Sequence, residues 1–380
     1  MTTRKFKAQL ITACAAAALL SGCSSAAYYW QSVNGHIEIM RSARPVTQLI
    51  ADAQTPEPLK TRLALSQRIR SFAVTALKLP DNASYRGYAD LHRGAAVWNV
   101  VAAPEFSLTL NTWCFPVVGC VGYRGYFNEV AARLEAQSLQ EQGLEVSVYG
   151  VPAYSTLGWL NWAGGDPLLN TFINYPEGEL ARLIFHELSH QVAYASGDTV
   201  FNESFATAVE RLGSQRWLET QASEAARQQY AVFNQRRQDF RALALTTRQE
   251  LAAVYAENDA LVTEFTTQHA IKSIVSSSLS SSSITSEREK AQAKALVMQG
   301  FHHRYAQLKL SWGGFSGYDP WVAKANNASF GAQAAYDELV PDFEALFERE
   351  NRDWQRFFDA VKKLTDLPKA ARRQALKTRQ

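Results

Sequence analysis

The chain is short of three things: net charge, apolar runs that could cross a bilayer, and internal repeats. Its formal net charge is +3, and residues 1–22 hold three basic and no acidic side chains, so the rest of the chain is formally neutral. This balance argues against a basic nucleic-acid-binding surface, and we expect no nucleic-acid partner. After residue 22 no apolar stretch is long enough to span a bilayer, and no composition break divides the chain cleanly.

The N-terminus has the pattern of a bacterial lipoprotein signal peptide. Basic residues precede a short apolar run over 10–20, and Leu20-Ser21-Gly22-Cys23 matches a lipobox. Removal of residues 1–22 would leave Cys23 as a lipid-modified N-terminus, and Ser24 after it is typical of outer-membrane sorting. We therefore expect a lipid-anchored protein on the periplasmic side of the envelope, at the outer membrane. A plain secretory signal with an incidental cysteine is the alternative.

Cys114 and Cys120 are the cysteines that remain after Cys23. They flank a tight loop that contains both proline and glycine. In the periplasm a disulfide between them is the natural prediction, and two reduced buried thiols are the alternative. Nothing beside the pair supplies the other ligands of a cysteine-type zinc site.

The segment Leu183–Val192 contains an H-E-x-x-H motif between apolar flanks. On a helix, His186 and His190 project from the same face one turn apart, so both imidazoles can bind one metal ion, with Glu187 beside it as general base. Twelve residues separate His190 from Glu203. A catalytic zinc takes three protein ligands and one water, so the pattern predicts one Zn²⁺ bound by the two histidines and Glu203. A buried polar network without metal is the alternative.

The residues around Glu203 indicate how it reaches the histidines. Ser196-Gly197-Asp198-Thr199 is a turn and helix-stop cluster, which predicts that the first helix ends just beyond Tyr194. Asn202 is the expected N-cap of the next helix, with Glu203 in its first turn. Glu210, two turns further on the same face, either orients a ligand histidine or faces solvent.

The order of elements predicts an α+β fold with a zincin-like catalytic core, in which a mixed sheet precedes the H-E-x-x-H helix. Extensive helices flank this core, and the C-terminal half is mainly helical. The expected segments are helical residues 23–80, the core over 81–270, a Ser-rich loop over 271–290 and helical residues 291–380. The Ser-rich segment is a poor helix by propensity, and a helix rescued by packing is the alternative to a loop.

Inside the core, short patterns predict the individual elements. We expect a helix over 127–142 and a second zinc helix that continues to about Ala270. The expected strands cover residues 95–102, 106–110, 145–151 and 153–157.

His186-Glu187-x-x-His190 followed by Asn202-Glu203-x-x-Ala206 resembles the gluzincin arrangement, in which a downstream Glu is the third zinc ligand. From about residue 24 to about residue 365, the chain resembles a family of bacterial envelope proteins known as predicted aminopeptidases. The segments that carry this second resemblance are Trp113–Cys120, Tyr123–Phe127, Ala153–Trp159 and Asn326–Ala328. The resemblance implies zinc-dependent hydrolysis of a peptide substrate. A G-x-M-E-N segment, which holds a free amine in well-known gluzincin aminopeptidases, is missing, so exo- and endopeptidase action both stay open.

In the zincin fold an extended substrate pairs with an edge strand above the zinc. Ala153, Tyr154, Ser155 and Thr156 are the candidates for that strand, and an ordinary internal strand is the alternative. The residue that stabilises the oxyanion stays open, and the conceivable donors are Tyr194, Tyr154, Tyr318 and Arg211. The alternative to a peptidase function for the whole chain is that of a non-catalytic binding or structural lipoprotein of the envelope.

Overall fold

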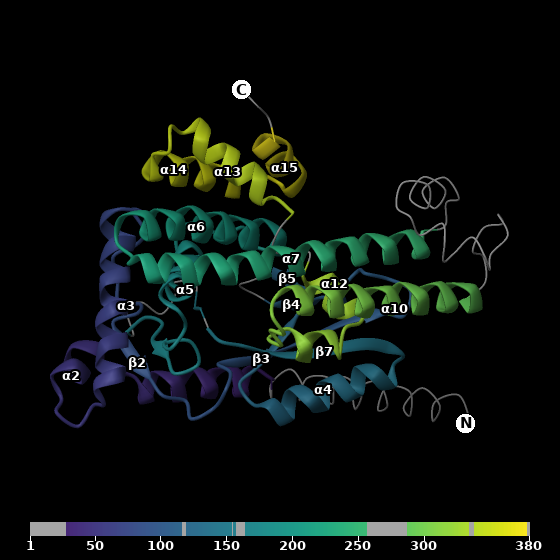
Figure 1. Cartoon of the computed structure of the whole chain (residues 1–380), viewed down its shortest axis with the longest axis horizontal. Helices are drawn as coiled ribbons and strands as arrows, with labels where there is room; N and C mark the ends of the chain where they lie inside the picture. Colours follow the sequence, from purple (N-terminus) through teal and green to yellow (C-terminus); the bar gives the residue numbers. More distant parts are fainter. Residues whose placement is uncertain are drawn as a thin grey trace, which may run out of the picture.

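The structure is a computed structural model, and it describes residues 28–115, 119–153, 155–156, 164–256, 287–333 and 338–377. Long helices surround three small sheets in this part of the chain, so the expected mixed α+β fold is confirmed (Figure 1). Cys23, Tyr154 and the serine run over 273–286 lie outside the described residues. The division of the chain into domains stays a prediction.

A three-stranded antiparallel sheet lies next to the helices that carry the H-E-x-x-H motif. β3 (Val97–Pro104) pairs along its whole length with β7 (Leu144–Val151), and its other edge pairs with β6 (Arg124–Tyr126). The strand predicted over 145–151 is thereby confirmed. β7 is an edge strand, because β3 is its only strand partner among the described residues.

The two faces of this sheet have different neighbours, because alternate residues of a strand point to opposite sides. On one face, Val100 packs in a cluster with the buried side of α4 (Glu129–Glu141), which confirms the predicted helix. On the opposite face, Val101 and Tyr149 pack with α12 (Asn327–Gln333). The sheet therefore separates α4 from α12.

A disulfide closes a short hairpin beside this sheet. The hairpin consists of β4 (Trp113–Phe115) and β5 (Gly119–Val121). Cys114 is bonded to Cys120 across the two strands. Gly119 has a φ of 77°, and a β-carbon on it would lie 2.7 Å from the backbone nitrogen of Gly197. The hairpin thus packs directly on the loop over 190–198, at a contact that only glycine fits.

The largest hydrophobic core joins the N-terminal helices to the motif helices. Its elements are the helix over 28–42, β1 (Arg44–Pro45), α2 (Val46–Ala51), α3 (Glu57–Thr75), β2 (Gly87–Ala89), β8 (Leu168–Leu169), α5 (Glu177–Ser189) and α6 (Thr199–Thr220). β1, β2 and β8 form a small sheet of their own. Phe185, Phe205 and Trp217 are fully buried in this core. The core therefore holds α5 and α6 from several sides.

Three C-terminal helices cover the outer side of α6 (Figure 1). They are α13 (Val340–Arg349), α14 (Trp354–Thr365) and α15 (Lys369–Lys377). Phe343 of α13 is fully buried, and its ring lies 5.0 Å from that of Phe201 and 5.6 Å from that of Phe205 on α6. Glu203, a predicted metal ligand, also lies on α6. The C-terminal helices therefore hold the helix that carries this ligand in place.

A second, smaller core joins α7 to α10. The elements around it are α7 (Glu224–Tyr255), α10 (Glu287–Ser311) and α11 (Asp319–Val322). Phe240 stacks on Tyr318 with ring centroids 4.1 Å apart, and Phe301 is fully buried nearby. No helix in the described ranges, the long helices α7 and α10 included, has an apolar stretch long enough to cross a bilayer.

Three predicted features of the chain differ from the structure. The predicted strand over 106–110 is wrong, because the chain turns after β3 and Ser107 donates a backbone hydrogen bond to Pro104. The helix expected to run on to Ala270 breaks after α6, where Ser223 caps the separate helix α7. Residues 287–290, which were expected in the Ser-rich loop, form the first turn of α10.

Phe343→Ala should lower the free energy of unfolding by about 3–5 kcal/mol, because it leaves a cavity against α6. Chemical denaturation followed by circular dichroism measures this loss. The matched control is Val232→Ala on the exposed side of α7, which should change stability by less than about 0.5 kcal/mol. Equal losses in the two variants would contradict the packing described for α13.

Candidate metal centre

α5 presents both histidines of the motif from the edge of the main core. Its buried positions are Leu180, Ala181, Ile184, Phe185 and Leu188. The helix ends at Ser189, with His190 as its C-cap in a helical conformation. It therefore stops before Tyr194, where the sequence placed its end. His186 and His190 still keep the one-turn spacing that metal binding needs.

α6 begins earlier than expected. Its N-cap is Asp198, whose carboxylate accepts a hydrogen bond from the backbone nitrogen of Phe201 at 3.3 Å. The predicted N-cap, Asn202, is therefore wrong, and Glu203 is the fifth residue of the helix instead of lying in its first turn. Asp198 has the short acidic side chain that caps helices well, and it lies three residues before the nitrogen it accepts from.

The loop between α5 and α6 is held by two separate contacts. Asn202 exchanges two hydrogen bonds with the backbone of Ala195, at 2.7 and 2.9 Å. Asp198 is only 1% exposed and pairs with Arg372 of α15 at 2.7 Å and with Arg373 at 2.9 Å. A buried carboxylate without such partners would be costly. The C-terminal helix therefore fixes the start of α6.

A glycine lets the two motif helices approach each other closely. A β-carbon on Gly213 of α6 would lie 3.0 Å from the ring of Phe185 on α5 and 2.8 Å from Leu77. Any larger side chain would push the helices apart. The close approach brings Glu203 within reach of the histidines.

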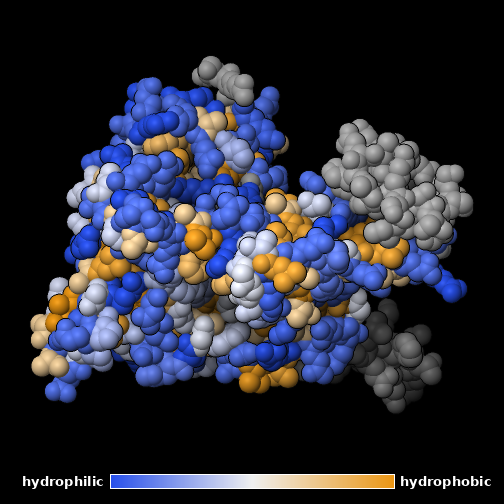
Figure 2. Space-filling view, viewed as in Figure 1, coloured by the Kyte–Doolittle hydropathy of each residue, from blue (hydrophilic) through white to orange (hydrophobic). Residues whose placement is uncertain are grey.

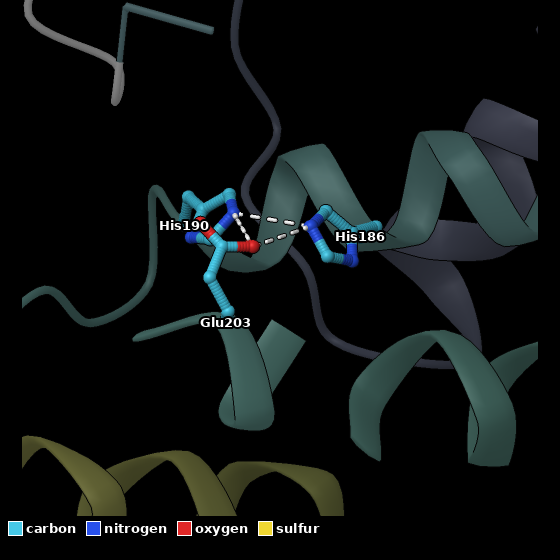
Figure 3. Close-up of side chains that lie close together, drawn as sticks. All are labelled: His186, His190 and Glu203. Atoms are coloured by element: carbon cyan, nitrogen blue, oxygen red, sulfur yellow. Dashed lines mark hydrogen bonds and ion pairs between the residues drawn. The ribbon is translucent and has the colours of Figure 1, made fainter. Parts of the chain in front are cut away.

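His186, His190 and Glu203 converge on one point (Figure 3). The Nε2 atom of His186 is 3.3 Å from Nε2 of His190 and 3.3 Å from Oε2 of Glu203, and that oxygen is 3.8 Å from Nε2 of His190. Ligand atoms about 2.0–2.2 Å from a tetrahedral zinc lie about 3.3–3.6 Å apart. Two imidazole nitrogens and one carboxylate oxygen are also a donor set of catalytic zinc. The three residues therefore could hold a metal ion, and their spacing and chemistry fit zinc.

Glu210 orients His186 from the side opposite the metal-facing nitrogen. Its Oε2 lies 3.0 Å from Nδ1 of His186, and since a carboxylate only accepts, Nδ1 carries a hydrogen and Nε2 is the nitrogen that could bind a metal in place of its proton. The other oxygen of Glu210 pairs with Arg182, which lies 3.8 Å from Glu179, and Glu179 pairs with Arg237 of α7. Glu210 is buried, so the solvent-facing alternative is wrong. A chain of charged groups thus runs from His186 to α7.

The electrostatic environment favours positive charge at this point. Burial would raise the pKa of Glu203, but attraction to His190 and His186 lowers it. Burial would likewise raise the pKa of Glu210, but Arg182 and His186 hold it at about 2. Burial would lower the pKa of His186, yet its bonds to Glu203 and Glu210 raise it to about 10. The two carboxylates that stabilise a proton on His186 would stabilise a metal cation in its place.

Glu187 lies beside the ligands and lines a cavity of about 1100 Å³. Burial raises the pKa of Glu187 to about 7, with Glu203 adding to the rise and His186 opposing it. Tyr149 and Gly150 of the edge strand β7 line the same cavity. A molecule in this cavity would therefore contact Glu187 and an edge strand together.

The predicted oxyanion donors lie in different places. Tyr318 and Arg211 line the cavity. Burial raises the pKa of Tyr194, and the charge of Glu203 raises it further. Tyr154 lies outside the described residues.

Two tyrosines near the ligands were missed by sequence reasoning. Tyr149 lines the cavity with Glu187. The pKa of Tyr123 is raised mainly by burial and next by the charge of Glu203. The available signals were the aromatic segment 123–127 and the period-two alternation of β7, which puts Tyr149 on the face opposite α4.

The predicted substrate strand over 153–157 is not a strand where the structure describes it. Ala153, Ser155 and Thr156 have no strand partner, and the backbone nitrogen of Thr156 donates instead to the buried carboxylate of Asp166 at 3.1 Å. The edge strand that reaches the cavity is β7.

Most of the chain matches one protein family. A family model described as "Putative aminopeptidase" matches residues 27–376. The chain belongs to this family. No curated protein and no solved structure matches it. Family membership confirms the resemblance to predicted aminopeptidases and supports a peptidase-like function, with a peptide as the substrate that it implies.

In this member of the aminopeptidase family, Glu210→Gln should weaken zinc binding by about 10- to 100-fold, because an amide no longer holds His186 by charge. Competition with a chelating dye measures the affinity, and a thermal melt shows whether the variant is folded. The matched control is Glu141→Gln, at an exposed position of α4 that does not line the cavity. Equal affinities in both variants would contradict the role given to Glu210.

Proposed function

We propose that this chain is a zinc-dependent aminopeptidase of the bacterial envelope, anchored by a lipid on Cys23 and working on the periplasmic side of the outer membrane. The convergence of His186, His190 and Glu203 on one point, beside Glu187 in the cavity wall, carries this proposal. The family match and the lipobox support it from independent directions.

Each residue of the centre has a separate task in this proposal. His186, His190 and Glu203 would hold Zn²⁺, and the zinc when bound polarises the scissile carbonyl and lowers the pKa of a water ligand. Glu187 accepts a proton from the attacking water and delivers it to the leaving amine. Glu210 keeps His186 in the tautomer and orientation that binding requires.

β7 is the strand on which we expect an extended peptide to pair, in place of residues 153–157. One edge of β7 is taken by β3, and Tyr149 and Gly150 place it at the wall that Glu187 shares. Backbone pairing along an edge strand gives affinity without strong demands on the side chains of the peptide. The position of β7 supports a substrate bound in extended form next to the base.

Glu187→Gln tests the proposal. Loss of the carboxylate should lower peptide hydrolysis by about 10²- to 10⁴-fold, because the water loses its general base. Zinc content should stay at one ion per chain, since Glu187 is not a ligand. Digestion of a peptide library by the full chain, read by mass spectrometry, measures the activity, and elemental analysis of the same samples measures the zinc.

Glu141→Gln is the matched control and should keep both activity and zinc, because Glu141 is exposed at the end of α4, on the face of the sheet away from the cavity. A chelator should abolish hydrolysis by the wild type, and added zinc should restore it. Wild-type protein without stoichiometric zinc would overturn the metal centre. Zinc-loaded protein that behaves the same with and without the Glu187 carboxylate would favour the non-catalytic binding lipoprotein.

A further inference from the structure

The helix over 28–42 carries an apolar face that the described part of the chain leaves uncovered. Tyr29, Trp30, Val33 and Ile37 are between 37% and 69% exposed. Their spacing places these four side chains on one side of the helix. Aromatic and aliphatic side chains together on an exposed helix face mark a surface that contacts something else.

This helix is fixed to the body of the protein. The side chain of Gln31 accepts a hydrogen bond from the backbone nitrogen of Phe127 at 3.1 Å. The ring of Tyr28 stacks on Phe115 with centroids 5.6 Å apart, and the guanidinium of Arg124 lies 4.1 Å from the Tyr28 ring. The apolar face is therefore presented in one orientation relative to the sheet.

α4 extends the same surface. Val130 and Leu134 lie one turn apart on its outer side, and each is more than half exposed. α4 and Tyr28 pack against the same face of the sheet, and both helices run along the lower edge of the molecule in Figure 1, where Figure 2 shows hydrophobic side chains. We call this surface the apolar base; its residues are Tyr29, Trp30, Val33, Ile37, Val130 and Leu134.

The apolar base holds most of the exposed large hydrophobic side chains in the described ranges. Eight such side chains are exposed there, and six of them belong to the base. The other two are Val232 on α7 and Leu310 on α10, which lie on separate helices. The concentration on one edge of the molecule distinguishes the base from ordinary scattered surface hydrophobics.

We propose that the apolar base rests on the lipid bilayer that holds the acyl chains of Cys23. This inference rests on the lipid anchor proposed above. Cys23 precedes Tyr28 by five residues, and a chain spans at most about 3.6 Å per residue, so the anchored lipid lies within about 18 Å of the helix. Residues 24–35 carry no charged side chain, and tryptophan and tyrosine favour the membrane–water interface.

A bilayer contact at this base orients the metal centre. Val100 and α4 lie on the base side of the sheet, whereas Tyr149, on the opposite face, lines the cavity. The sheet thus stands between the bilayer and the cavity wall formed by Tyr149. The lipid tethers the chain and the base fixes its orientation on the bilayer, so that the cavity is held toward dissolved peptides.

Fluorescent labels at matched positions test the apolar base in the full lipid-modified chain, reconstituted into vesicles of phosphatidylethanolamine and phosphatidylglycerol. With Cys23 acylated and Cys114 bonded to Cys120, an introduced cysteine is the free thiol of the processed chain. The first pair is Val33→Cys and Val232→Cys, at valines that are 52% and 49% exposed. The second pair is Leu134→Cys and Leu310→Cys. Brominated lipid should quench the labels at positions 33 and 134 and leave those at 232 and 310 unchanged.

Every other outcome has a defined meaning. Equal quenching at all four positions, in chains that float with the vesicles, overturns the apolar base and leaves the lipid anchor standing. Chains that do not float overturn both the anchor and this inference. Shielding of the label at position 33 that grows with protein concentration in the absence of lipid shows a second copy on the face, and it overturns the bilayer contact. Peptide hydrolysis by the same chains reports separately on the proposed enzyme.

Discussion

The packing of α5 against α6 is the constraint on which the rest of the structure depends. α5 brings His186 and His190, α6 brings Glu203, and Gly213 lets the two helices lie close together at Phe185. The surrounding elements support this pair from outside: the C-terminal helices lie on α6, and the disulfide-closed hairpin packs on the connecting loop. A metal site of this kind tolerates little displacement, because its ligand geometry is set to within tenths of an ångström.

Charge pairing explains why so many ionisable groups can be buried next to one another. Glu203 and Glu210 are both held ionised, by the two histidines and by Arg182 respectively. Each charge thus offsets part of the free-energy cost of removing its neighbour from water. The carboxylate of Glu187 forms no ion pair within the described residues, and its raised pKa sets it apart from the other two. Two kinds of carboxylate in one centre suit two roles, one structural and one in proton transfer.

The fold class and the three converging residues could be predicted from the sequence, because their signals are local. The spacing of four residues predicts that His186 and His190 lie on one face of a helix, and the residue types predict that they can bind a metal ion. The rest depends on contacts between distant segments. Asp198 caps α6 with a partner 174 residues away, so the local pattern favoured Asn202. Which strand forms the sheet edge at the cavity depends on how β3 pairs with its neighbours. Period-two alternation predicts a strand, but it does not predict the partners of that strand.

The pairing of Asp198 with Arg372 also has a consequence for the order of events in biogenesis. A chain is synthesised from its N-terminus, so α5 and α6 leave the ribosome well before the residue that secures the start of α6. Until Arg372 arrives, a buried aspartate has no cation of α15 beside it, and the helix that carries Glu203 is only partly fixed. Assembly of the candidate metal centre is thereby tied to completion of the chain. A chain that ends before α15 would therefore lack the contact that secures the helix carrying Glu203.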